Sequence, residues 1–303
     1  MVDKPTVTAI TATYNCSATL KLTLESLLNQ TFTDFEAWVI GDACTDDSEH
    51  IVQGFQDARL HWKNLPHNHG SQAFPNNEGL RLARGKYIAY LGHDDLWCAD
   101  HLAGLVRQIE AEQADFVHAL CICFDPEGAR LCFGPPASDQ SYQRHFLPPS
   151  SWMHTKRVVD MIGYWRDPNQ LAWAVDHDYM LRIHRAGLKM SGVQQTTVLK
   201  FPSPWFGIYA LKGTPPQAHW WQRIKSDPQQ LERDLLQEVT RLCAQSQKIS
   251  DMPLSHLITE PLRTFKRYLV YTYGERGPLK PLLCWYFRAY RRRMKQRRGL
   301  VTK

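Results

Sequence analysis

Two adjacent carboxylates, Asp94 and Asp95, are the residues most suited to chemistry in this sequence. They follow Tyr87–Leu91, a run of apolar, aromatic and β-branched residues that is too short for a typical helix and predicts a buried strand. Neighbouring carboxylates repel each other, so burial without compensation would raise the pKa of at least one of them. A divalent cation that carries phosphates would compensate both charges. The alternative is a solvated acidic turn that caps the next helix.

Strand-like and helix-like segments alternate around this acidic pair. Strands are predicted at 7–13, 36–40, 60–65 and 87–91, and helices at 17–30, 46–56, 75–85 and 99–112. Such alternation with short connections predicts an α/β fold, in which a mostly parallel sheet is covered by helices on both faces. Ligands of such sheets bind outside the carboxyl ends of the strands. Because Tyr14, Asp42 and the acidic pair each follow a predicted strand, we expect them along one edge.

Tyr14 and Asp42 together suit a nucleobase. An aromatic ring can stack on the base, and a carboxylate can accept a hydrogen bond from an imide N–H. The alternatives are a partly buried core tyrosine and an aspartate that stabilises the turn Asp42–Asp47.

Five short motifs stand in the order found in family 2 glycosyltransferases, and over residues 5–110 the chain resembles that family. The motifs are Thr11–Asn15, Leu24–Phe32, Gly41–Ser48, Asn76–Gly79 with Ala83–Ile88, and Gly92–Asp95. The resemblance implies the GT-A fold, a nucleotide-sugar donor with a UDP-sugar expected, Mn²⁺ or Mg²⁺ as cofactor, and inversion at the anomeric carbon. The acceptor implied is a hydroxyl of a glycan or a lipid-linked sugar.

The resemblance also assigns roles to single residues. Tyr14 packs on the base and Asp42 accepts from its imide, Asp94 approaches the ribose or the donor sugar, and Asp95 holds the metal against the diphosphate, with Asp94 beside it in the metal-binding pair. The remaining donor-binding candidates are Thr13, Asn15 and Asn77.

Inverting transfer needs a base that takes the proton from the acceptor hydroxyl. The family places an acid at the start of a helix after the acceptor loop. Asp176 matches that position best, and Asp178 is the reserve candidate. The alternative role for Asp176 is capping of that helix, worth about 1 kcal/mol.

The chain departs from the family pattern at three places. Ala43-Cys44 replaces part of an acidic turn, Asn76 stands where Arg is usual, and His93 stands where the metal motif often begins with Asp. The departures at Asn76 and His93 leave open a second interpretation, a non-catalytic nucleotide- or glycan-binding protein on a decayed transferase fold. A nucleotidyltransferase or a dinucleotide dehydrogenase is disfavoured, because no Gly-rich phosphate loop follows the first strand.

Charge divides the chain into two parts. Residues 261–303 carry 13 Lys and Arg against one acid, whereas the rest has 23 Lys and Arg against 29 acids. We predict a GT-A domain over 1–216, with a nucleotide-binding half at 1–114 and an acceptor half at 115–216, followed by a helical extension over 217–303. At the basic end, apolar residues recur every three or four positions: Leu283, Phe287, Tyr290 and Met294.

This composition is typical of an interfacial helix on an anionic membrane surface. Packing on the body of the protein is the alternative, and nucleic acid is disfavoured because no base-reading motif accompanies the charge. The polar N-terminus does not resemble a signal peptide, and the scattered cysteines suit a reducing compartment. We therefore expect a cytoplasmic protein, peripheral on the inner face of the plasma membrane.

Overall fold

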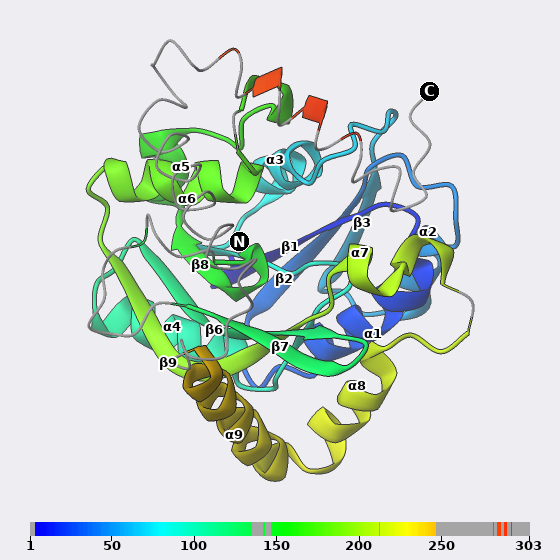
Figure 1. Cartoon of the computed structure of the whole chain (residues 1–303). Helices are drawn as coiled ribbons and strands as arrows, with labels where there is room; N and C mark the ends of the chain where they lie inside the picture. The colour runs from blue at the N-terminus through cyan, green and yellow to red at the C-terminus, as the bar shows by residue number, and fades with distance from the viewer. Residues whose placement is uncertain are drawn as a thin grey trace.

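The computed structural model describes residues 4–134, 142, 147–171, 173–211 and 213–246, and positions 281, 284, 285, 288, 289 and 292. Strands of this part form one sheet in the order β3-β2-β1-β4-β8-β6-β9-β5, with β7 beside β6 (Figure 1). The first four strands are β1 (Val7–Thr13), β2 (Phe35–Gly41), β3 (Leu60–Asn64) and β4 (Tyr87–Tyr90). All three pairings among them are parallel, so they form the predicted parallel half of the sheet.

The second half of the sheet is mixed. Its strands are β5 (Leu96–Trp97), β6 (Phe116–Asp125), β7 (Gly128–Phe133), β8 (Trp152–Thr155) and β9 (Met190–Lys200). β8 runs antiparallel to both β4 and β6, whereas β6 and β9 are parallel. The predicted α/β fold is confirmed, with the parallel pairings confined to β3-β2-β1-β4 and to β6-β9.

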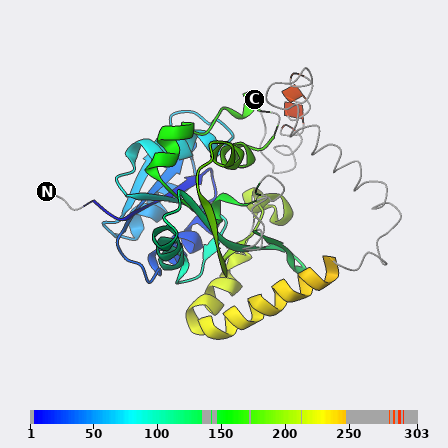
Figure 2. The same ribbon diagram turned by 90° about the vertical axis from the view of Figure 1, so that its left-hand side faces the viewer.

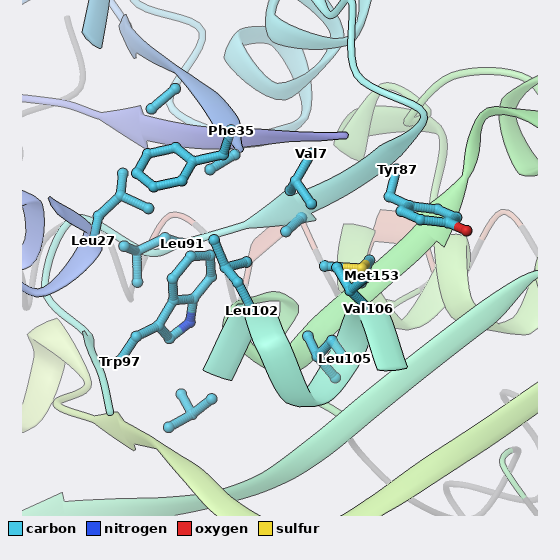
Figure 3. Close-up of a cluster of buried hydrophobic side chains, with 14 of the residues drawn as sticks. Val7, Leu27, Phe35, Tyr87, Leu91, Trp97, Leu102, Leu105, Val106 and Met153 are labelled. Atoms are coloured by element: carbon cyan, nitrogen blue, oxygen red, sulfur yellow. The ribbon is translucent and has the colours of Figure 1, made fainter. Parts of the chain in front are cut away.

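One face of the sheet is covered by three helices, α1 (Ser17–Leu28), α2 (Ser48–Gly54) and α4 (His101–Ala111). Side chains alternate between faces along a strand, and Val7 of β1 points to this side. It shares a buried cluster with Leu27 of α1 and with Leu102 and Leu105 of α4 (Figure 3). The apolar sides of these helices therefore pack against this face of the parallel strands and hold the strands in place.

The opposite face carries α3 (Ala73–Leu82), α5 (Lys156–Ile162) and α6 (Val175–Arg185). Ile10 of β1 points to this side and packs with Tyr90. Large rings fill the space beneath α6: Trp165 stacks on Tyr179 with centroids 4.6 Å apart. Indole Nε1 of Trp165 donates to the Tyr90 hydroxyl at 3.2 Å. This aromatic layer joins β4 to the helices of the second half.

Two helices follow the sheet, α8 (Gln217–Ser226) and α9 (Pro228–Ser246), and Figure 2 shows α9 as a long helix along the outside. Trp221 of α8 and Leu235 of α9 are buried in one cluster with Phe124 and Leu199 of the sheet. Beyond residue 216 the chain thus continues to share a core with the preceding strands.

The predicted amphipathic basic helix falls largely outside the described residues. Of its described positions, Cys284 is buried, with Sγ 3.7 Å from the carbonyl oxygen of Gln170, and Trp285 is 63% exposed. Among the helices that the structure describes, none is long and apolar enough to cross a membrane.

Candidate active site

The carboxyl ends of β2, β1 and β4 meet at one edge of the sheet. The N–H of Asp42, after β2, donates to the carbonyl of Thr13 at the end of β1 at 2.8 Å, and Leu91 N–H donates to Ile10 O at 2.9 Å. These bonds bring the turn after β4, which holds Asp94, beside the end of β1. Tyr14, Asp42 and the acidic pair therefore lie on one rim.

Asp95 is fully buried and held by the protein itself. Its Oδ2 accepts from the Ser150 hydroxyl and, at 2.9 Å, from Lys200 Nζ, while its Oδ1 accepts from the Phe201 N–H at 3.2 Å. Burial alone would lower the pKa of Lys200, but the charges of Asp95 and Asp94 outweigh it and raise that pKa. Lys200 therefore stays protonated and neutralises Asp95.

Asp94 is held on one side only. Its Oδ2 accepts from the Ser203 hydroxyl at 2.5 Å, and its backbone oxygen accepts from Gln217 Nε2 at 2.8 Å. The structure gives its Oδ1 no hydrogen bond from the described residues, and the residue is 7% exposed. Of the pair, Asp94 is thus the carboxylate with an oxygen left for a ligand.

The oxygens of the acidic pair suit a divalent cation unequally. Mg²⁺ is bound in phosphate-transfer sites by one or two carboxylates together with substrate phosphates and water. Asp94 fits that requirement, whereas Asp95 would have to give up Lys200. Within the described ranges, no three His, Cys, Asp or Glu side chains cluster as a metal site, so most ligands of such a cation would come from the donor and from water.

The carboxylate of Asp42 is hydrogen-bonded to a loop of the same chain. Both of its oxygens lie 3.0 Å from the His69 N–H, Oδ1 lies 2.8 Å from His69 Nδ1, and Oδ2 accepts from the Gly70 N–H at 2.8 Å. The His69 ring stacks on Phe74 with centroids 4.4 Å apart. The carboxylate expected to accept from a base therefore makes hydrogen bonds to the His69-Gly70 loop.

Tyr14 and its neighbours occupy the other side of the rim. The Tyr14 ring is half-buried and lies 6.5 Å from the ring of Tyr209 between centroids. Asn15 Oδ1 accepts from the Thr45 N–H at 2.8 Å, which uses its side chain to fix the turn. The Thr13 hydroxyl is buried, and the described residues offer it no hydrogen-bond partner.

Asn77 is a buried residue of α3. Its side chain forms two hydrogen bonds with the backbone of Trp165, accepting from N–H at 2.8 Å and donating to C=O at 2.9 Å. These two hydrogen bonds join α3 to the loop before α6.

Asp176 and Asp178 both lie in the first turn of α6, but their surroundings differ. Asp178 is ion-paired with Arg182, Nε to Oδ2 at 2.9 Å. Asp176 is 8% exposed, and its Oδ1 accepts from the His177 N–H at 2.7 Å. Burial raises the pKa of Asp176, and the His177 N–H and the charge of Lys200 partly oppose this shift. Asp176 is thus the carboxylate better suited to accept a proton.

Comparisons with known proteins identify the family. A family model described as Glycosyl transferase family 2 matches residues 8–131. A glycosyltransferase of Methanocaldococcus jannaschii, MJ1057, is 37% identical over 215 residues, which are 67% of this chain and 72% of that protein. The chain belongs to glycosyltransferase family 2. The β-1,3-glucosyltransferase WfaP of Escherichia coli is 33% identical over 113 residues, 37% of this chain. The match spans less than half of WfaP, 45% of its length.

Solved structures support the fold of this family 2 member. Staphylococcus aureus TarS 1–349 in complex with UDP-GlcNAc superposes with a TM-score of 0.57 at 17% identity, covering 97% of this chain and 90% of that one. The mannosyltransferase PcManGT of Pyrobaculum calidifontis, in complex with GDP-Man and Mn²⁺, gives a TM-score of 0.53 at 15% identity, covering 99% and 86%. The chain therefore has the GT-A fold.

Four residues at the site of this family 2 protein were not foreseen from sequence: His69, Ser150, Lys200 and Ser203. Of these four, Lys200 is the residue that a local sequence feature could have indicated, because it is a charged residue at the end of an apolar strand-like run. His69 lies in a loop, Ser150 in the 3₁₀ turn Pro149–Ser151 and Ser203 at the start of the short helix α7 (Ser203–Phe206). Nothing local connects them to acids that are 27 to 109 positions away.

Proposed function

We propose that this chain is an inverting, metal-dependent glycosyltransferase that moves a sugar from a nucleotide-sugar donor, with a UDP-sugar expected, to an acceptor hydroxyl. The observation that carries the proposal is the state of the acidic pair: Asp95 is neutralised by Lys200, and Asp94 keeps one oxygen on the rim that also holds Tyr14 and Asp42. Asp95 alone would be explained as a structural ion pair, whereas the second oxygen of Asp94 receives no hydrogen bond from the described residues.

Each group on the rim has a proposed task. Tyr14 stacks on the base and Asp42 accepts from it, which requires Asp42 to exchange a bond with the His69-Gly70 loop. Asp94 holds Mg²⁺ or Mn²⁺, with Asp95 fixing the turn behind it. The bound cation would neutralise charge that develops on the leaving diphosphate. Thr13, Asn15 and Asn77 remain proposed donor-binding residues, and the side chains of Asn15 and Asn77 also hydrogen-bond to the backbone of Thr45 and Trp165.

Asp176 is the proposed base. It lies at the start of α6, and its raised pKa makes it a stronger proton acceptor than an exposed aspartate. Deprotonation of the acceptor hydroxyl by Asp176 would accompany attack on the anomeric carbon from the face opposite the diphosphate. Asp178 remains the reserve candidate, although its ion pair with Arg182 holds it in the core.

The proposed acceptor is a glycan or a lipid-linked sugar of cell-surface polysaccharide synthesis. WfaP is named for a GlcNAc-diphosphoundecaprenol acceptor, and a relative from Staphylococcus aureus, TarP, is named a poly(ribitol-phosphate) N-acetylglucosaminyltransferase. The proposal includes a GT-A domain over 1–216 and a helical extension over 217–303, with the basic end on an anionic membrane from the cytoplasmic side.

A second candidate function is non-catalytic binding of a nucleotide or glycan. It is favoured by the occupied state of Asp42, whose oxygens are hydrogen-bonded to His69 and Gly70. This second function would be supported if the unaltered protein binds a nucleotide but transfers no sugar.

Thermal unfolding with nucleotides tests the proposal. UDP or GDP at about 100 times its dissociation constant should add about 2.7 kcal/mol of stability, and the shift should need Mg²⁺ or Mn²⁺. Asp94→Asn should lose the metal-dependent part of the shift, because a neutral amide lacks the negative charge that the carboxylate offers to the cation. Failure of the unaltered protein to respond to any nucleoside diphosphate with metal would overturn the proposal.

A further inference from the structure

The segment that follows β9 crosses the rim and is tied to both acids. Phe201 N–H donates to Asp95 Oδ1 at 3.2 Å, and Ser203 Oγ donates to Asp94 Oδ2 at 2.5 Å. The segment then forms α7 (Ser203–Phe206) and turns at Gly207, where φ is 57°. That left-handed conformation suits glycine and leads the chain into the 3₁₀ turn Ile208–Ala210.

This turn places Tyr209 against the nucleoside side of the rim. Its ring lies 6.5 Å from Tyr14 with the planes tilted by 47°, and 6.0 Å from His93 in an edge-on arrangement. Contacting aromatic pairs have centroids about 4.5–7 Å apart. The separation of Tyr14 and Tyr209 is near the upper limit of that range, and their planes are neither parallel nor perpendicular. Both rings are half-buried.

We infer that Tyr209 contacts the donor, as the second aromatic wall of a nucleoside site whose first wall is Tyr14. The inference rests on the proposed function. A base that stacks on the Tyr14 ring would also lie against the Tyr209 ring, because the two rings are 6.5 Å apart and their planes open at 47° to each other. Because the same segment binds Asp94 and Asp95, a donor that reaches the acidic pair also lies beside Tyr209.

Binding of UDP and of inorganic diphosphate, both with Mg²⁺, tests this role by isothermal titration calorimetry. Tyr209→Ala should bind UDP about tenfold more weakly, because the base loses one of the two aromatic rings that it contacts. Its affinity for diphosphate, which has no base, should stay within about twofold of the unaltered protein. Tyr209→Phe keeps the π-face and should bind UDP nearly normally.

The matched control is Tyr164→Ala, since Tyr164 is 43% exposed and its ring packs under Arg81 at 5.2 Å. It should leave UDP affinity unchanged. If Tyr209→Ala lowers the thermal midpoint without ligand, Tyr209→Leu, which keeps bulk but has no π-face, provides the same comparison.

Three results would overturn the inference: unchanged UDP affinity in Tyr209→Ala, an equal loss of affinity for diphosphate, or an equal loss in Tyr209→Phe. The first two results would mean that Tyr209 only packs against its neighbours or supports the acidic pair. The third would mean that Tyr209 contacts the donor through its hydroxyl group. These outcomes are distinct from failure of the proposed function, in which the unaltered protein itself binds neither UDP nor GDP.

Discussion

Lys200 Nζ lies 2.9 Å from Oδ2 of Asp95, and the two residues, 105 positions apart in the sequence, join the end of β9 to the turn after β4. The Asp95 side chain is fully buried and that of Lys200 is 21% exposed. The pair links the parallel half of the sheet to the mixed half, next to Asp94 in the chain. Its charge balance therefore supports both the stability and the shape of the candidate active site.

Replacing Lys200 by Met should destabilise the protein by about 3 kcal/mol or more, because it leaves a buried carboxylate without its counter-charge. Urea unfolding at neutral pH measures this change. In the double variant D95N/K200M the lost stability should return in large part, since no buried charge then remains.

Lys200→Arg is the matched control for charge, and it should lose less stability than Lys200→Met. If Lys200→Met unfolds at the same urea concentration as the unaltered protein, the ion pair does not hold the two halves together.

Asp176→Asn should abolish sugar transfer while raising folding stability at neutral pH. Burial raises the pKa of Asp176 above its ordinary value of 3.8. The folded state therefore binds the proton more tightly than the unfolded state, and this group's contribution to stability falls as pH rises from 3.8 through the raised pKa. An amide removes that penalty. Thermal unfolding across pH 4–8, with transfer assayed in parallel, measures both effects.

The acid limb of kcat/KM should reflect the same group, since transfer requires ionised Asp176 and declines as pH falls through its pKa. Asp178→Asn is the comparison: it breaks the buried pair with Arg182 and should destabilise by about 3 kcal/mol. Transfer that survives in Asp176→Asn but disappears in folded Asp178→Asn would reverse the two assignments.

The parallel half of the fold could be predicted from the sequence, because each of its strands and helices has a recognisable pattern of apolar residues and ends at residues typical of turns or caps. β5, with only Leu96 and Trp97, is too short to show a period, and its partner β9 lies about a hundred residues later. Site chemistry divides in the same way: Asp42 and Asp94 follow recognisable strands, whereas the groups that donate to their side chains, from His69, Gly70 and Ser203, lie 27 to 109 positions away in the sequence. Hydrogen bonds of that kind have no local pattern.

Asn77→Ala should cost about 1–3 kcal/mol of stability, because two buried backbone groups of Trp165 lose their partner. UDP affinity in the folded variant should fall too, because Asn77 is also a proposed donor-binding residue. Calorimetric titration after a urea unfolding series checks both points. Unchanged UDP binding with lowered stability would instead leave Asn77 only its hydrogen bonds to Trp165.

His69→Ala should tighten UDP binding by about two- to tenfold, because one hydrogen bond that competes for Asp42 is removed and such a bond is worth about 0.5–1.5 kcal/mol. The N–H groups of residues 69 and 70 still hold the loop. His67→Ala, an exposed position in the same loop, serves as the control. Weaker binding in His69→Ala would show that the imidazole assists the base.

The placement of β8 has a consequence for how the chain can be divided. β4 is bonded on one side to β1 and on the other to β8, with Ile88 opposite His154. A fragment that stops at residue 114 would leave β4 with a bare row of N–H and C=O groups, the kind of surface that recruits strands from other molecules. Expression of such a fragment should give aggregates, and the nascent chain completes its central strand pairing only after the residues of β8 have been synthesised.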